Sequence, residues 1–187
     1  MPPHDGLRAC SGGRRSSRLE PASSMKDAPA SVRCVVAHES AVFAARTILR
    51  AFATRIGFER EVIEELAIVV SELASNILKY GRRGHIDLSL TERDEPRAVG
   101  GRLRGITIVA EDETPPFDLA GSLRDGYDTH GKLDPARVFG RGGIGAGLGA
   151  VARLSDSVEL VPHEGGKRIV VRRFVGRPRR GSSPGFF

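Results

Sequence analysis

The sequence contains no tryptophan, only two cysteines and no long uninterrupted apolar run. The two cysteines, Cys10 and Cys34, do not form the pattern of a disulfide framework or of a metal site, so a reducing compartment is expected. No apolar run approaches the roughly 18 residues that a membrane-spanning helix needs. The first residues are rich in Arg, Ser and Gly and lack a central apolar block, so a secretory signal is not expected. These absences favour a cytoplasmic location.

The excess of basic residues lies at the two ends of the chain. The net charge is +6 over 187 residues, of which residues 1–30 carry +2 and residues 176–187 carry +3. Residues 31–175 are therefore nearly neutral, and they hold most of the periodic apolar pattern. We predict one folded domain over 31–175 between two disordered basic tails. The near-neutral domain disfavours specific nucleic-acid binding.

Apolar periodicity predicts the order of strands and helices. Period-two or mostly apolar runs predict strands at 32–36, 86–90, 106–110, 158–162 and 169–175. Residues 92–104 and 119–139 are expected to be loops. Together with three helices, this order predicts an α+β fold, a two-layer α/β sandwich whose mixed, mainly antiparallel sheet carries its helices on one face.

The first two helices have recognisable ends. The first is predicted to begin at an N-cap, Ser40, and to stop at Gly57. The second is predicted from near Glu59 to Gly81, with Tyr80 on its apolar face. A third helix is expected over residues 146–154.

The second helix also carries a polar stripe beside its apolar face. The stripe consists of Glu65, Glu72, Asn76 and Lys79 at helical spacing. An acid, an amide and a cation in line beside a core face suggest a functional site. A solvated stripe of ordinary i,i+4 pairs would produce the same pattern, so the stripe alone does not decide between the two.

A glycine run at 140–149 precedes the third helix. Gly142, Gly143, Gly145 and Gly147 allow the backbone to approach a ligand closely, and phosphate is the ligand expected where such a run opens a helix. The run is not a Walker A loop, because no Gly-Lys-Ser/Thr follows. It is not a dinucleotide fingerprint, because a loop precedes it. The alternative is a flexible linker.

Asp112 ends the predicted central strand, before a turn made rigid by Pro115 and Pro116. A carboxylate in this place can accept the exocyclic amine of an adenine ring. The alternative is an Asp that starts a turn and caps its own backbone.

Taken together, these stretches resemble the Bergerat-type, or GHKL, ATP-binding superfamily, which includes the histidine kinases and the anti-sigma regulatory kinases of the RsbT/RsbW type. Glu72-x-x-x-Asn76 with Lys79-Tyr80 is similar to the N-box of that superfamily. Residues 112–118 are similar to the first glycine box of the superfamily. Residues 123–129 and 152–156 are similar to the corresponding segments of kinases of the RsbT type. The resemblance implies the histidine-kinase-like ATPase fold over 31–175, with an ATP lid at about 119–141.

The resemblance also implies roles for individual residues. Asn76 would hold Mg²⁺ against ATP, Glu72 would orient or deprotonate the attacking hydroxyl, and Asp112 would bind the adenine amine. The residues implied at the phosphates are Gly143, Gly145 and Gly147, with Lys79 and Arg141 as candidate charge neutralisers.

By the same resemblance, the chain would be an ATP-dependent serine/threonine protein kinase acting on a STAS-domain antagonist. It would regulate transcription or a stress response by partner switching, and would also dock a sigma factor or a PP2C-type phosphatase. The resemblance leaves open whether the chain forms a homodimer. The alternative is a Bergerat-fold binding module that has lost catalysis.

Three features depart from the family pattern. Thr114 stands where the family prefers glycine, and its β-branch restricts the backbone. The lid holds extra residues at 131–141. After the last glycine, Gly166, the chain has Lys167-Arg168 and lacks the threonine that often supports the adenine site.

Overall fold

The computed structural model describes residues 30–123, 127–128, 131–132 and 147–176 of the chain. Its main sheet has five strands in the order β1-β2-β3-β7-β6, and every neighbouring pair is antiparallel. The strands are β1 (Ser31–Val36), β2 (Gly84–Asp94), β3 (Arg102–Asp112), β6 (Ser157–His163) and β7 (Gly166–Phe174). The predicted α+β class is confirmed, with β3 in the centre as predicted. The main sheet is antiparallel throughout, whereas a mixed sheet was expected.

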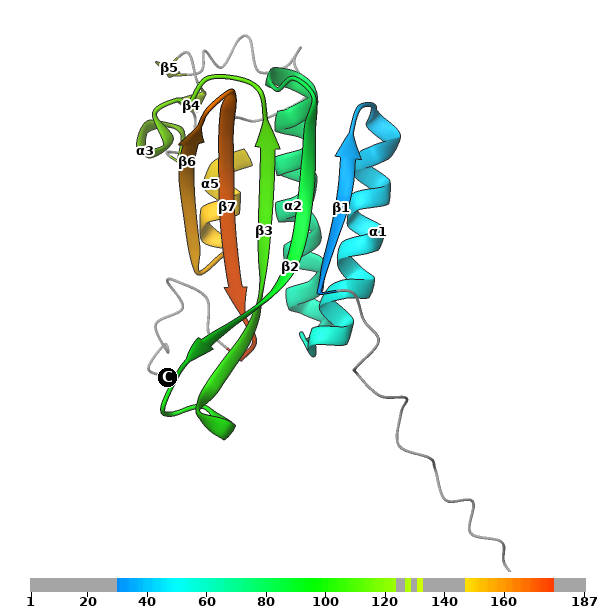
Figure 1. Ribbon diagram of the computed structural model, residues 1–187, viewed down its shortest axis with the longest axis vertical. Coiled ribbons are helices and arrows are strands. Elements are labelled where there is room, and N and C mark those ends of the chain that lie inside the picture. The colour runs from blue at the N-terminus through cyan, green and yellow to red at the C-terminus, as the bar shows by residue number, and fades with distance from the viewer. Residues whose placement is uncertain (1–29, 124–126, 129–130, 133–146, 177–187) are drawn as a thin grey trace, which may run out of the picture.

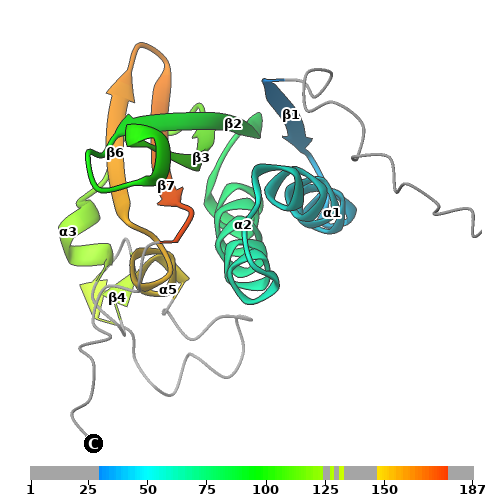
Figure 2. The same ribbon diagram turned by 90° about the horizontal axis from the view of Figure 1, so that it is seen from below.

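Three helices cover one face of this sheet and leave the other face open (Figures 1 and 2). They are α1 (Glu39–Ile56), α2 (Arg60–Tyr80) and α5 (Gly147–Arg153). The short elements are η2 (Val99–Gly101), α3 (Leu119–Ser122), β4 (Tyr127–Asp128) and β5 (Gly131–Lys132). The predicted two-layer arrangement, with helices on one face, is therefore confirmed.

The core lies between the helices and the sheet. Leu49 of α1 and Leu73 of α2 are fully buried, and Ile108 of β3 is fully buried beneath them. These side chains recur at helical spacing in the helices and at every second position in the strands, so each element presents one apolar face. Burying a side chain of this size stabilises the fold by about 1.5–3 kcal/mol.

The helix boundaries follow the predicted signals with two exceptions. Gly57 ends α1 in the left-handed conformation, at φ 100°, as expected of a glycine C-cap. Ser40 is not the N-cap: the N-cap of α1 is His38, two residues earlier, and the Ser40 hydroxyl bonds to the His38 ring at 2.7 Å. The second helix ends at Gly81 as predicted, but Tyr80 is 54% exposed because α2 stops at this residue.

The β2–β3 hairpin is longer than predicted. The expected loop over 92–104 is strand at both ends, and pairing continues to Asp94 opposite Arg102, so only residues 95–101 connect the two strands. Ion pairs across the hairpin explain the difference. The Glu92 carboxylate accepts a hydrogen bond from the Arg102 guanidinium at 3.2 Å, and it lies 3.4 Å from Nε of Arg104. Its charged residues therefore face one another across two paired strands, and the hairpin extends beyond the rest of the sheet (Figure 1).

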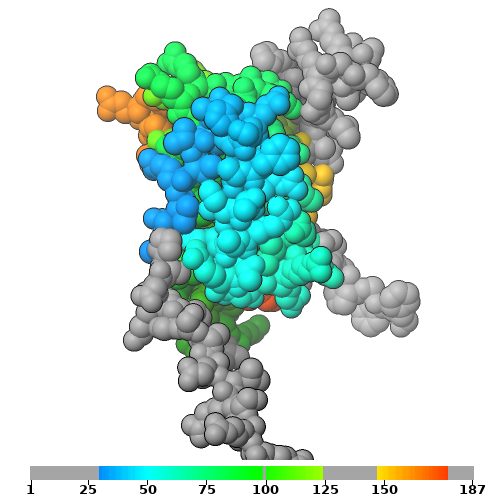
Figure 3. All heavy atoms as spheres, turned by 90° about the vertical axis from the view of Figure 1, so that its right-hand side faces the viewer, coloured from blue at the N-terminus to red at the C-terminus, as the bar shows by residue number. Residues whose placement is uncertain are grey.

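The sheet edge at β1 and the outer side of α1 form one flank of the molecule (Figure 3). Val35 and Phe43 are exposed there, at 66% and 67%. Among the described helices, none has the length and apolar character to cross a membrane. The two predicted tails and most of the predicted glycine loop lie outside the described residues.

Candidate functional site

The end of α2, the end of β3 and the start of β7 meet at one end of the sheet (Figure 1). Two glycines make this meeting possible. A Cβ at Gly81 or Gly84 would lie 3.2 Å from the Cβ of Asp112, and at Gly81 it would also lie 2.7 Å from the Ile77 carbonyl oxygen. The turn that follows α2 thus packs directly against Asp112, which brings two of the three predicted stretches together.

The third stretch reaches the site through α5. A Cβ at Gly147 would lie 2.6 Å from Oε2 of Glu72, so the carboxylate can take this position only because the first residue of α5 is a glycine. Glu72 comes from the middle of α2, the helix that α5 contacts. The predicted acid of the N-box and the last glycine of the predicted phosphate loop are therefore in contact.

The other predicted residues are only partly placed. Asn76 is half-buried on α2, one turn after Glu72, and Lys79 is exposed in the last turn of the helix. Arg141, Gly143 and Gly145 lie outside the described residues. The grouping of Asn76 with the glycine loop remains a prediction.

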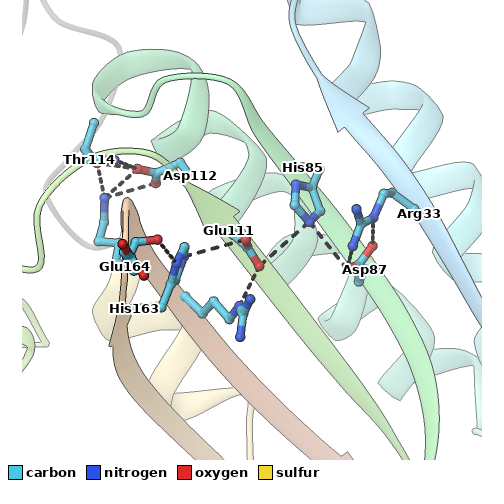
Figure 4. Close-up of polar contacts among 10 residues, drawn as sticks. Arg33, His85, Asp87, Glu111, Asp112, Thr114, His163 and Glu164 are labelled. Carbon is cyan, nitrogen blue, oxygen red and sulfur yellow. Dashed lines mark hydrogen bonds and ion pairs between the residues drawn. The ribbon is translucent and has the colours of Figure 1, made fainter.

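Asp112 is 7% exposed and its carboxylate is already bonded within the chain (Figure 4). Its Oδ1 accepts the backbone N–H of Thr114 at 2.8 Å and also the Thr114 hydroxyl. The Lys167 ammonium lies 2.8 Å from Oδ1 and 3.0 Å from Oδ2. The alternative considered for Asp112, a carboxylate that caps its own turn, is thus the geometry found. Its role in reading adenine remains a prediction.

Sequence reasoning did not find Lys167 as a member of this cluster. Lys167 lies opposite Asp112 in the β3–β7 register, and its own exposed fraction is only 6%. A usable signal existed, because Lys167 follows Gly166, where the family often has threonine. Its significance depended on the strand register, which periodicity alone does not reveal.

The neighbouring residues point to the open face of the sheet and form a separate network (Figure 4). Arg168 donates to Glu111 at 2.5 Å, and this hydrogen bond holds the pKa of Glu111 below its ordinary value. Arg33 does the same for the pKa of Asp87, to which it donates at 2.7 and 2.6 Å. His85 lies between the two carboxylates. Side chains alternate between faces along a strand, so this network is separated from Asp112 by the sheet itself.

The residues fit an ATP molecule unequally at its two ends. At the acid end, the Glu72 carboxylate lies against the bare backbone of Gly147, at the start of the helix that follows the predicted phosphate loop. At the adenine end the residues do not fit ATP in the geometry found. The Asp112 carboxylate already accepts hydrogen bonds from the Lys167 ammonium and from the hydroxyl and backbone N–H of Thr114. An adenine amine would meet an occupied acceptor. Among the described residues, no group of three or more His, Cys, Asp or Glu side chains forms a metal site.

The five-stranded sheet with helices on one face, and the contact between Glu72 and Gly147, accord with one class of protein. The family described as "Histidine kinase-like ATPase domain" matches residues 35–173, most of the chain. The chain therefore belongs to the histidine kinase-like ATPase family, and ATP is the ligand that this membership implies.

A curated relative narrows the class to the regulatory kinases. The chain is 33% identical over 120 residues to "Serine/threonine-protein kinase RsbT" of Bacillus subtilis (strain 168). The matched segment covers 64% of this chain and 77% of the relative. The resemblance to the RsbT/RsbW type, first noted on short motifs, is confirmed over a matched segment of 120 residues.

Proposed function

We propose that the chain is an ATP-dependent serine/threonine protein kinase of the anti-sigma switch type, with a STAS-domain antagonist as its substrate. The contact between the Glu72 carboxylate and Gly147 is the observation that carries the proposal. A binding scaffold has no evident need for an acid held against a bare glycine backbone at the start of a helix. The similarity to RsbT supports the reaction class.

In this proposal each residue has a limited task. Glu72 orients or deprotonates the acceptor hydroxyl, Asn76 holds Mg²⁺, and Gly143, Gly145 and Gly147 surround the phosphates. Bound Mg-ATP would supply the phosphoryl group and most of the charge neutralisation, as phosphoryl transfer requires. Lys79 and Arg141 are further candidates for neutralising charge.

The proposal includes a cellular location and protein partners. We infer a cytoplasmic domain over 31–175 with an ATP lid at about 119–141. A sigma factor or a PP2C-type phosphatase would be the second partner, and regulation of transcription or a stress response the output. A homodimer is compatible with this arrangement.

The test is transfer of radiolabelled γ-phosphate from ATP to the STAS protein encoded nearest to this chain. Wild type should label the substrate, and Glu72→Gln should reduce labelling by about a hundredfold or more, in the range expected of a lost general base. ATP binding should persist in the variant, because Glu72 acts on the acceptor hydroxyl.

A matched control lies on the same helix. Glu61 is exposed in the first turn of α2, and Glu61→Gln removes one carboxylate without touching the site. Its labelling should equal that of wild type. Equal labelling by Glu72→Gln would refute the role assigned to Glu72.

A second candidate function is favoured by the occupied Asp112. A Bergerat-fold module that has lost catalysis, and that sequesters a sigma factor or activates a PP2C-type phosphatase, would not need a free adenine acceptor. Folded wild-type protein that neither labels the STAS protein nor binds Mg-ATP at millimolar concentration, yet forms a stable complex with a sigma factor or a PP2C-type phosphatase, would establish the module instead of the kinase.

A further inference from the structure

Lys167 and Asp112 are neighbours because the register of strands β3 and β7 places them opposite each other. They are directly opposed in the antiparallel β3–β7 pair, so their side chains leave the sheet on the same face. Both side chains are more than nine-tenths buried, at 8% and 9% exposed. A buried ammonium in this position has the carboxylate beside it as its natural partner.

The Lys167 ammonium has three N–H donors, and three acceptors surround it. They are Oδ1 of Asp112, Oδ2 of Asp112 and the hydroxyl of Thr114. The ring of Phe117 lies 5.7 Å from the same nitrogen and adds a favourable cation–π contact. The ammonium is thus fully satisfied without any ligand.

The Asp112 carboxylate is correspondingly engaged. Its Oδ1 accepts from Lys167 and twice from Thr114, and its Oδ2 accepts from Lys167. An exocyclic amine needs one of these oxygens with its negative charge available. The amine would approach a carboxylate that an ammonium already neutralises and partly covers, so its hydrogen bond would be weak.

We propose that Lys167 is an internal competitor for the nucleotide base. Its ammonium takes, on Asp112, the place that the amine of a 6-aminopurine requires, and Thr114 holds it there. The free chain therefore binds adenine nucleotides weakly and with little preference for the amine, and strong binding requires that Lys167 leaves Asp112. The inference rests on the proposed function in taking ATP as the ligand.

The chain offers a matched control at the next residue. Arg168 carries the same charge one position further along β7, but it pairs with Glu111 on the open face of the sheet. Lys167→Thr and Arg168→Thr each remove one cation from the same strand. Only Lys167→Thr frees the Asp112 carboxylate, and it leaves a hydroxyl that can still donate to it.

The experiment compares ATP with inosine triphosphate, in which a carbonyl replaces the amine at C6. Dissociation constants of both are measured by calorimetry for the full-length wild type, Lys167→Thr and Arg168→Thr. In wild type and Arg168→Thr the two nucleotides should bind within about threefold of each other. In Lys167→Thr, ATP should bind about ten- to a hundredfold more tightly than in wild type, as expected when a hydrogen bond to a charged group is gained. Inosine triphosphate should improve by clearly less than ATP, because its C6 carbonyl cannot donate to the carboxylate and only the hydrogen on N1 remains as a donor on this edge of the base.

Two results would overturn the inference in distinguishable ways. A wild type that already prefers ATP over inosine triphosphate tenfold, with no gain in Lys167→Thr, would show that Asp112 is available, and the proposed kinase function would stand. Folded proteins that bind neither nucleotide in any variant would refute both this inference and the proposed function. Circular dichroism monitors folding, and Lys167→Met serves as the second variant if Lys167→Thr does not fold, with the same expected gain for ATP.

Discussion

Two buried ion pairs anchor the two ends of β7, and they differ in what holds them. At one end Lys167 meets Asp112, and at the other Arg173 donates to Asp156 at 3.2 Å, with side chains 3% and 7% exposed. Both pairs lie on the helix side of the sheet, because residues 167 and 173 are an even number of positions apart. Burial and charge alone do not tell them apart.

The partners of the two carboxylates do tell them apart. Asp156 also accepts the backbone N–H of Phe174 at 2.7 Å, and its own N–H donates to the Arg172 carbonyl at 2.9 Å. The turn between α5 and β6 is therefore bound to the backbone of β7. Asp112 is bonded to side chains and to the N–H of its own turn, so it can exchange a partner without separating two elements. A buried ion pair linked to backbone of another element is structural, whereas one built from side chains can belong to a site.

The largest expected effect comes from breaking the structural pair. Asp156→Ala removes the acceptor of the Phe174 N–H together with one partner of a buried guanidinium, which should cost about 3–5 kcal/mol of unfolding free energy. Urea denaturation followed by circular dichroism measures it. The preference for ATP over inosine triphosphate should be the same as in wild type. A loss below about 1 kcal/mol, or a change in nucleotide preference, would break the distinction between the two pairs.

A smaller effect on stability, but a clear one on activity, is expected at the contact between Glu72 and Gly147. In Gly147→Ala the new methyl group would lie 2.6 Å from Oε2 of Glu72, so the flexible carboxylate must move away. Stability should change by less than about 1 kcal/mol, because alanine favours a helix over glycine. Phosphate transfer should fall by about tenfold or more, because the acid is displaced from its position.

The control for this prediction uses the same acid. In a Glu72→Gln background, Gly147→Ala should cause little further loss of transfer, because the two changes act on one contact. Additive losses would indicate that Gly147 acts independently of Glu72, and the contact would then belong with the structural interactions.

The smallest effect is expected from the open-face pair of Glu111 and Arg168. The lowered pKa of Glu111 means that its ionised form is favoured by folding, so its contribution is present above about pH 4.3 and is lost as the pH falls through the lower folded-state pKa. Arg168→Gln removes the main cause of this shift. The variant should be slightly less stable than wild type at pH 6, and the gap should close below about pH 4.

Denaturation of both proteins between pH 3 and pH 6 measures this gap. A gap that grows on acidification would contradict the lowered pKa of Glu111.

Much of the fold was predictable because its signals are local. The extent of α2 follows from apolar residues at helical spacing and from Gly81, and the central position of β3 follows from its nearly continuous apolar run. The length of the β2–β3 hairpin was not predictable from periodicity, because its charged residues are stabilised by partners on the opposite strand. The N-cap of α1 was predicted two residues too late, because the N-cap is His38 and the Ser40 hydroxyl bonds to the His38 ring rather than capping the helix.

The candidate site also contains residues that the sequence indicated and one residue that it did not. Glu72, Asn76 and Asp112 were recognisable from spacing within their own segments, and the structure brings Glu72 to Gly147 as the motif pattern indicates. Lys167 was overlooked as a partner of Asp112 because the two are 55 positions apart. Their meeting depends on a strand register that a single sequence does not display.

The amino-acid sequence by itself determined which residues can bury an apolar face, which can end a helix and which carry charge. It therefore determined the order of elements, the family and the candidate acid, amide and glycines. Only the tertiary structure decided that the Asp112 carboxylate is already bonded to Lys167 and Thr114. The physical reason is that the availability of a buried charge depends on the groups that the other strands and turns place within hydrogen-bond distance of it.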